Sequence, residues 1–244
     1  MLIQLHGREV STDIIRDISI AQLLVPDDAK RLIEASRKVV PFEHILVTGL
    51  DFEGYRTGTG TILATDFPAA YLASYFAEDL FTHDPMARMC ITQRRRVTDE
   101  EAWATEQSDD ADGRLRQLHD RYAIRNRIAV PLTRADRIYG SLVVTSEHRL
   151  TVGQEEYLSF IAEPLHSALS KRFIPEITKR LGLTKGELQC VELASRGLTS
   201  EEIAEETAYS VLTVNSYLKA VTKKLSCANR TEAVAEAIRR GLIG

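Results

Sequence analysis

The stretch from Thr213 to Leu225 constrains the fold most, because its side chains divide between two faces of one helix. The apolar and aromatic residues recur at helical spacing: Val214, Tyr217, Leu218, Val221 and Leu225. The other side of the predicted helix holds amides, hydroxyls and ammonium groups, with no acidic residue: Asn215, Ser216, Lys219, Thr222 and Lys223. Such a helix buries one face and offers the other to an anionic partner.

Three further helices are predicted around this segment. One begins after Thr184 and ends at Gly197, a short one covers SEEIAEETA, and the last follows Asn229. A short helix, a tight turn and a basic amphipathic helix make a helix-turn-helix, whose second helix enters the DNA major groove. Asn and Lys can donate to base edges there, and Ser, Thr and Lys can hold phosphate oxygens. The predicted DNA contacts are Thr213, Asn215, Ser216, Lys219, Thr222 and Lys223.

The segment from Leu183 to Ile243 resembles the LuxR-type DNA-binding domain over its whole length. The matching elements are the opening LT with Glu187, Gly197, the EIA of Glu202–Ala204, the TV of Thr213–Val214, the KL of Lys224–Leu225, and the closing NR…AV…A…GLI. Three positions depart from the family: Gly186 stands for the usual Arg, Val191 for Leu, and Tyr217 for a frequent His. The resemblance implies that the last helix can pair two such domains.

Residues 1–173 have the pattern of a mixed α/β domain. Two apolar, β-branched runs, RIAVPL and RIYGSLVVTSE, flank a polar turn at Arg134–Asp136 and predict an antiparallel hairpin, and HILVTGLDF predicts another strand. Helices are expected at Ala69–Glu78, Pro85–Gln93 and Gly113–Tyr122. We therefore expect an α+β protein, with an N-terminal α/β/α sandwich around an antiparallel sheet and an all-α, four-helix C-terminal domain.

A long helix is predicted from Thr151, which forms a capping box with Gln154. Pro164 should bend or divide this helix. One helical stripe is apolar: Leu158, Ile161, Leu165, Ala168 and Leu169. The stripe is compatible with packing on the sheet and with a contact between subunits.

The segment YLASYFAEDLFTHDPMA resembles the acyl-homoserine lactone receptors, and the likeness extends over about residues 30–170. The family places an aromatic residue, a Tyr four residues later, and Asp-Pro nine residues after the Tyr; here these are Tyr71, Tyr75 and Asp84-Pro85. The resemblance implies that Asp84 accepts the amide N–H of the ligand and that the two tyrosines donate to its carbonyl oxygens. Apolar residues would enclose the acyl chain.

Three positions depart from the receptor pattern. Tyr71 stands where the family usually has Trp, although a phenol can still donate a hydrogen bond. A second family Trp falls on Asp99 by an ungapped count, and Trp103 is the candidate to replace it in the ligand site. Arg127 replaces a Gly before the IAVP strand, so its long cationic side chain would crowd a lactone pocket or select a different ligand.

The chain of 244 residues is long enough for two domains: a sensor at 1–170, a linker at 171–180 and a DNA-binding domain at 181–244. No apolar run is long enough to span a bilayer, and the N-terminus does not resemble a signal peptide. The three cysteines lie far apart and the histidines show no ligand spacing, so no metal or other cofactor is expected. These features favour a cytoplasmic protein that does not bind membranes.

The expected function is a homodimeric transcription regulator that binds an operator in double-stranded DNA and is controlled by a small acylated lactone in quorum sensing. One alternative is a sensor domain that is ligand-independent, with Arg127 and Asp99 filling the cavity, or that binds a different small molecule. Another is an enzyme fused to a regulator. The N-terminal sequence shows no Ser/His/Asp constellation, phosphate loop or paired-carboxylate signature, so we expect no catalytic residues.

Overall fold

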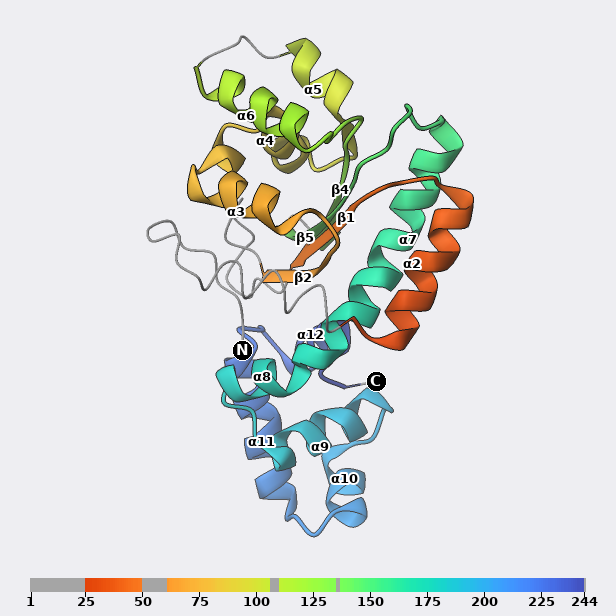
Figure 1. Ribbon diagram of the computed structural model, residues 1–244. Coiled ribbons are helices and arrows are strands. Elements are labelled where there is room, and N and C mark those ends of the chain that lie inside the picture. The colour runs from red at the N-terminus through yellow and green to blue at the C-terminus, as the bar shows by residue number, and fades with distance from the viewer. Residues whose placement is uncertain (1–24, 50–60, 106–109, 135–136, 244) are drawn as a thin grey trace. The chain divides into compact units, whose positions relative to one another are not determined.

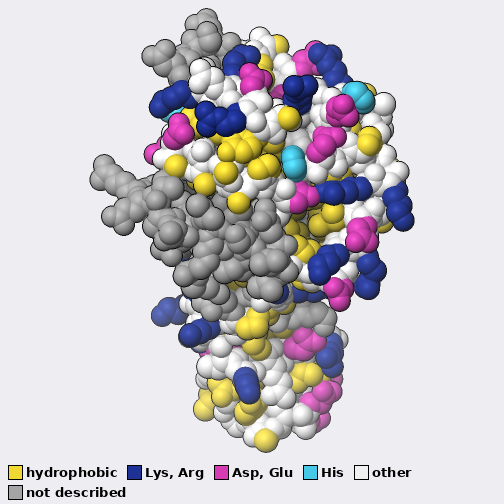
Figure 2. All heavy atoms as spheres, viewed as in Figure 1, with side chains coloured by type: hydrophobic (Ala, Val, Ile, Leu, Met, Phe, Trp, Pro, Cys, Tyr) yellow, Lys and Arg dark blue, Asp and Glu magenta, His cyan; other side chains and the backbone are white. Residues whose placement is uncertain are grey.

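The computed structural model describes residues 25–49, 61–105, 110–134 and 137–243 (Figure 1). The chain divides into two compact units, residues 2–169 and residues 170–244. Lys, Arg, Asp and Glu side chains are interspersed on the visible face of the first unit (Figure 2). Within the described part of the chain, no helix combines the length and the apolar composition of a membrane-spanning segment.

A five-stranded antiparallel sheet forms the centre of the first unit. Its strands are β1 (Ile45–Gly49), β2 (Thr61–Thr65), β3 (Val97–Thr98), β4 (Ile128–Arg134) and β5 (Arg137–Val144), in the order β2-β1-β5-β4-β3. The predicted β4–β5 hairpin is confirmed, with Ile128 opposite Val144 and Leu132 opposite Gly140. The sequence did not predict β2 or β3. All five residues of β2 are buried and β3 has two residues, so neither strand shows the alternation of a half-exposed strand.

Helices cover both faces of this sheet, which confirms the predicted α/β/α sandwich (Figure 1). One layer contains α3 (Ala69–Ala77), α4 (Pro85–Gln93), α5 (Asp99–Thr105) and α6 (Asp110–Arg121), with a short 3-10 segment at Leu80–Thr82. The other contains α2 (Asp27–Val39) and α7 (Val152–Ser170). His166 of α7 packs on this second face, with its ring 5.1 Å from the ring of Tyr139 in β5.

Helix α7 begins with the predicted capping box. The Thr151 amide donates to Gln154 Oε1 at 2.9 Å, and the Gln154 amide donates to Thr151 Oγ1 at 3.3 Å. Pro164 lies inside α7, which continues as one helix to Ser170. The apolar stripe is largely buried, as Leu158, Ile161, Leu165 and Leu169 show. Pro164 therefore does not divide the helix.

The second unit is all α-helical in its described residues. It contains a 3-10 segment at Lys171–Phe173, then α8 (Ile174–Arg180), α9 (Lys185–Ser195), α10 (Ser200–Glu206), α11 (Val211–Lys224) and α12 (Arg230–Arg239). The four predicted helices correspond to α9–α12. The segment 171–180, expected to be a linker because of its charges and Pro175, is helical and belongs to this unit. The core includes Val191, Ile203, Val214, Leu218, Val221 and Ala237.

Candidate functional site

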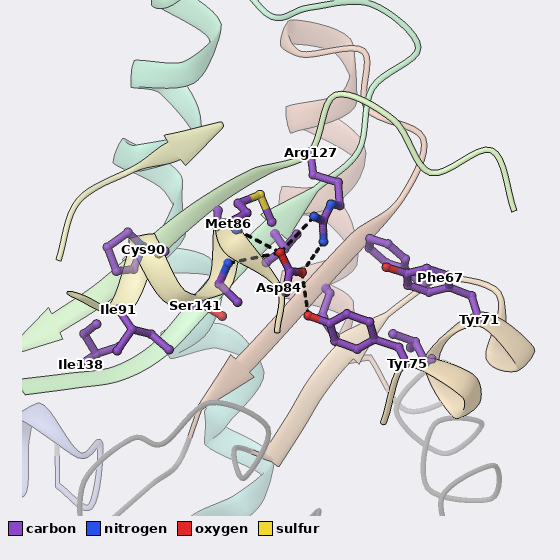
Figure 3. A pocket seen from close by; sticks show the side chains of 16 residues that line it. Phe67, Tyr71, Tyr75, Asp84, Met86, Cys90, Ile91, Arg127, Ile138 and Ser141 are labelled. Atoms are coloured by element: carbon purple, nitrogen blue, oxygen red, sulfur yellow. Dashed lines mark hydrogen bonds and ion pairs between the residues drawn. The ribbon is translucent and has the colours of Figure 1, made fainter. Parts of the chain in front are cut away.

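A cavity of about 600 Å³, counting its opening to solvent, lies in the first unit between the sheet and helices α3 and α4. Figure 3 shows the Asp84 carboxylate and the Arg127 guanidinium facing each other in this site. The rings of Phe67, Tyr71 and Tyr75 lie on one side of this pair. Met86, Cys90, Ile91 and Ile138 lie on the other side. The cavity thus combines a polar centre with an aromatic and an aliphatic wall.

Helix α3 places Tyr71 and Tyr75 one turn apart on the face that lines the cavity, because side chains at i and i+4 share a helix face. Their rings stack with centroids 5.8 Å apart, and Tyr71 stacks in turn on Phe67 at 5.5 Å. Tyr71 is 3% exposed and Tyr75 is 9% exposed. The sequence-predicted aromatic pair therefore forms part of the cavity wall.

Asp84 is both the N-cap of α4 and the carboxylate of the site. Its Oδ1 accepts the amide of Met86 at 3.0 Å and that of Ala87 at 3.4 Å, while Pro85 occupies the first helical turn. Its Oδ2 accepts the hydroxyl of Tyr75 at 2.7 Å. A cap fixes a carboxylate firmly, so the local structure orients Asp84 toward the cavity.

Arg127, immediately before β4, reaches the same carboxylate. Its Nη1 donates to Asp84 Oδ2 at 2.6 Å, and its Nη2 donates to Asp84 Oδ1 at 3.1 Å and to Asp99 Oδ1 at 2.7 Å. The Arg127 side chain is 3% exposed, that of Asp84 is 1% exposed and that of Asp99 is 15% exposed. Two of the three residues that depart from the receptor pattern, Asp99 and Arg127, thus form one ion-pair cluster with Asp84.

The charges of this cluster set the protonation states around the cavity. Burial alone would raise the pKa of Asp84, but the Arg127 guanidinium outweighs it and the pKa lies below its usual value. Burial and the Asp84 charge hold the pKa of Tyr75 well above its usual value. Burial, with a smaller effect of Arg127, lowers the pKa of nearby His119 to about 3. At neutral pH the site therefore contains a charged Asp84–Arg127 pair and protonated phenols.

Trp103 does not line the cavity. It lies in α5, where its ring packs against the aromatic core and is covered by the Arg116 guanidinium at 3.9 Å from the ring centroid. Asp99, at the start of α5, points its carboxylate to Arg127 instead. That Trp103 takes the place of the second family Trp at the ligand stays a prediction, because its half-buried indole packs against the cluster of Tyr71 and Tyr75 without lining the cavity.

In the second unit, α11 divides into the two predicted faces. Val214, Leu218 and Val221 are buried, and Leu225 at the C-cap is 2% exposed. Tyr217 is half-buried and packs edge-to-face on Tyr209, with centroids 5.3 Å apart. Of the predicted DNA contacts, Asn215, Ser216, Lys219 and Lys223 are exposed, and Thr213 and Thr222 are half-buried.

The hydrogen bonds at the start of α11 orient its outer face. Ser210 caps the helix by accepting the amide of Thr213 at 3.2 Å. The Ser200 hydroxyl at the start of α10 donates to Asn215 Oδ1 at 2.6 Å, so the Asn215 amide nitrogen is left as the donor on this exposed side chain. A fixed amide donor near exposed Lys219 suits both base-edge and phosphate contacts.

Family models match both units. The autoinducer binding domain matches residues 26–169, and the luxR family of bacterial regulatory proteins matches residues 181–237. The chain belongs to the LuxR family. It is therefore a DNA-binding transcription regulator with an autoinducer-binding domain, and this family consists of regulators rather than enzymes.

Similar proteins come from several bacteria. The quorum sensing-dependent regulator VjbR of Brucella abortus is 32% identical over 198 residues, which cover 75% of this chain and 74% of VjbR. The transcriptional activator AhyR of Aeromonas hydrophila is 27% identical and covers 75% of this chain and 73% of its own. The crystal structure of Escherichia coli SdiA has a TM-score of 0.48 at 17% identity and covers 95% of this chain and 98% of that chain.

Proposed function

We propose that an acylated lactone binds the cavity of the first unit and changes how strongly the second unit binds DNA. The observation that carries this proposal is the convergence of Tyr71, Tyr75 and Asp84 on one cavity with an aliphatic wall. Ligand cavities of this kind are mostly apolar, with a few polar groups that fix the orientation of the ligand. Acyl-homoserine lactones are the first such compounds to test, and the match of residues 26–169 to the autoinducer binding domain supports a small-molecule signal.

Each part of the chain has its own role in this proposal. Residues 1–170 would bind the signal and form the dimer, residues 171–180 would join the two parts, and residues 181–244 would bind DNA. A pair of recognition helices reads two half-sites about one helical turn apart, so the regulator acts as a homodimer in this proposal. It acts in the cytoplasm, where a bacterial chromosome is accessible.

The contacts to DNA are proposed for the outer face of α11. Asn215 and Lys219 would donate to base edges, while Ser216, Lys223 and the half-buried Thr213 and Thr222 would hold phosphate oxygens. The absence of acidic side chains from this face of the described helix supports the assignment, because a carboxylate there would repel the DNA backbone.

The experiment is expression in a host that makes no acyl-homoserine lactone, followed by thermal unfolding with a panel of lactones of different acyl length. A ligand at about 100 times its Kd adds roughly 2.7 kcal/mol, which corresponds to about 5–10 °C in Tm for a domain of this size. A rise of this size with one acyl length supports the proposal. No change in Tm or soluble yield with any member of the panel contradicts it.

A second candidate is a sensor that needs no ligand, and the Asp84–Arg127–Asp99 cluster favours it. In the buried centre of the unit, the Arg127 guanidinium forms ion pairs with the carboxylates of both Asp84 and Asp99. The charges of these three side chains are therefore paired without a ligand. Space that is open to solvent remains beside them, so Arg127 and Asp99 do not close the site completely. The same panel decides between the two candidates, because a ligand-independent regulator is soluble and binds DNA equally well with every compound.

A further inference from the structure

The hydrogen-bonding capacity of the Asp84 carboxylate is already used within the protein. Its Oδ1 accepts from Met86 N, Ala87 N and Arg127 Nη2, and its Oδ2 accepts from Tyr75 Oη and Arg127 Nη1. A carboxylate offers about four lone-pair sites, so these five donors saturate it. Asp84 is also the only carboxylate among the described residues that line the cavity.

Arg127 is fixed in this position by its second partner. Its Nε lies 3.1 Å from both oxygens of Asp99, its Nη2 donates to Asp99 Oδ1 at 2.7 Å, and its backbone amide donates to Asp99 Oδ2 at 3.0 Å. Moving the guanidinium away from Asp84 would therefore break contacts to two carboxylates in a buried setting, which is strongly unfavourable. A ligand must adapt to the pair rather than displace it.

The polar centre consequently offers donors more readily than acceptors. The pKa of Tyr71 lies above its usual value, mainly because of burial, so its hydroxyl stays protonated at neutral pH. The Tyr71 hydroxyl lies beside the Arg127 side chain, which can only donate hydrogen bonds, so the phenol proton is left to donate to a carbonyl oxygen of a ligand. An amide N–H of the ligand finds the Asp84 oxygens occupied.

We propose that Arg127, held by Asp99, is a specificity-determining residue that makes the cavity prefer acylated lactones with an ester link over those with an amide link. The inference rests on the proposed function, since it concerns the ligand of the same cavity. An ester presents the same carbonyl oxygens as the amide but carries no N–H that needs a carboxylate acceptor. A buried donor without a partner weakens binding by about tenfold or more.

The test compares two matched compounds, N-decanoyl-homoserine lactone and α-decanoyloxy-γ-butyrolactone, which differ by one N–H replaced by oxygen. Their Kd values for the full chain are measured by isothermal titration calorimetry. We expect the ester to bind the wild type at least about tenfold more tightly than the amide. Equal Kd values, or tighter binding of the amide, would overturn the inference and leave the proposed function standing.

The double variant Asp99→Trp/Arg127→Gly restores the residues of the receptor pattern and frees Asp84 to accept from the ligand. We expect the preference to reverse, with the amide binding more tightly than the ester. The matched control is Arg95→Met/Glu101→Gln, which removes an exposed ion pair of the same unit away from the cavity and should leave the wild-type ratio unchanged. If neither compound binds the wild type or the double variant, the proposed function fails and the inference fails with it.

Discussion

At the scale of single residues, His119 shows how burial can make the sensor unit sensitive to acid. The side chain is 7% exposed and its Nε2 has no hydrogen-bond partner in the described structure. Burial and the nearby Arg127 lower its pKa to about 3 in the folded chain. The unfolded chain, with an ordinary histidine pKa near 6.5, takes up a proton first as the pH falls.

Stability from His119 is therefore fully present above about pH 6.5 and declines as the pH falls toward the folded pKa. Between pH 7 and pH 5 this one group removes about 2 kcal/mol of unfolding free energy. We predict that His119→Leu makes the stability of the sensor unit less dependent on pH in this window, as measured by urea unfolding. His148→Leu, at an exposed position, serves as the control, and an equal effect of both variants would contradict the prediction.

Gly186 and Tyr217, two departures from the LuxR pattern, lie in contact. A Cβ added to Gly186 would come within 2.8 Å of Cε2 of Tyr217, so the tyrosine occupies space that a larger residue at 186 would need. In the sequence, Gly186 and Tyr217 appear as two unrelated departures from the LuxR pattern, neither of which changes the predicted fold. Their contact could not be predicted, because it joins the first turn of α9 to the middle of α11.

We predict that Gly186→Ala destabilises the DNA-binding unit by about 1 kcal/mol, since overpacking outweighs the better helix propensity of Ala. Gly153→Ala is the matched control: it is also in a first helical turn, and an added Cβ there has no atom within 4 Å. Chemical unfolding measures both variants. A stabilising effect of Gly186→Ala equal to that of Gly153→Ala would show that Tyr217 imposes no constraint.

At the scale of elements, the ion pair of Glu187 and Lys224 joins α9 to the end of α11. Lys224 Nζ lies 2.7 Å from both carboxylate oxygens and donates to the Gly182 carbonyl at 2.6 Å. Burial alone would raise the pKa of Glu187, but the hydrogen bonds from Lys224 and Thr184 lower it below its usual value. Its contribution is thus present above the ordinary glutamate pKa and is lost as the pH falls through the lower folded value.

We predict that Lys224→Met destabilises the DNA-binding unit by roughly 1–3 kcal/mol, because it leaves a 6% exposed carboxylate without its cation. Arg196→Met, which removes an exposed i,i+4 pair with Glu192, should change stability by less than about 0.5 kcal/mol. Urea unfolding at pH 7 compares them. Similar losses for the two variants would contradict the assigned role of the pair.

The outer face of α11 leads to a prediction about DNA. Lys219→Ala should weaken binding of a selected duplex by about tenfold at physiological salt without changing the unfolding free energy, because the side chain is exposed. Lys179→Ala removes the same charge from an exposed position of α8 and should have a smaller effect. Fluorescence anisotropy measures both Kd values. Unchanged affinity of Lys219→Ala would remove this residue from the DNA contacts.

The helices with strong periodicity and the β4–β5 hairpin could be predicted from the sequence, because caps and alternation are local signals. The carboxylate and the two tyrosines that line the cavity could be predicted only through the resemblance to the acyl-homoserine lactone receptors, because their spacing alone is equally typical of core residues and a helix cap. The Arg127–Asp99 ion pair could not be predicted from the sequence. Each residue appears there only as a separate departure from the receptor pattern, and the two lie 28 positions apart. The position of Trp103 outside the cavity lining could not be predicted for a related reason: the direction of a side chain in α5 depends on where that helix begins.

At the scale of the whole molecule, a regulator needs a signal that distinguishes two states of the chain. A ligand that binds a DNA-competent and an incompetent state equally well changes nothing, however tightly it binds. Stabilisation of the sensor unit by a bound lactone is therefore necessary for regulation in this proposal but is not sufficient. The effect must also appear in the affinity of the full chain for DNA.

The most direct measurement is the Kd of the full chain for a duplex selected from a random library, with and without a saturating acylated lactone, at one fixed salt concentration. The proposed function predicts a shift in Kd of at least about fivefold when the ligand is present, typical of a coupling between two sites. A shift in either direction is consistent with it. A lactone that binds the cavity but leaves the Kd for DNA unchanged would contradict it.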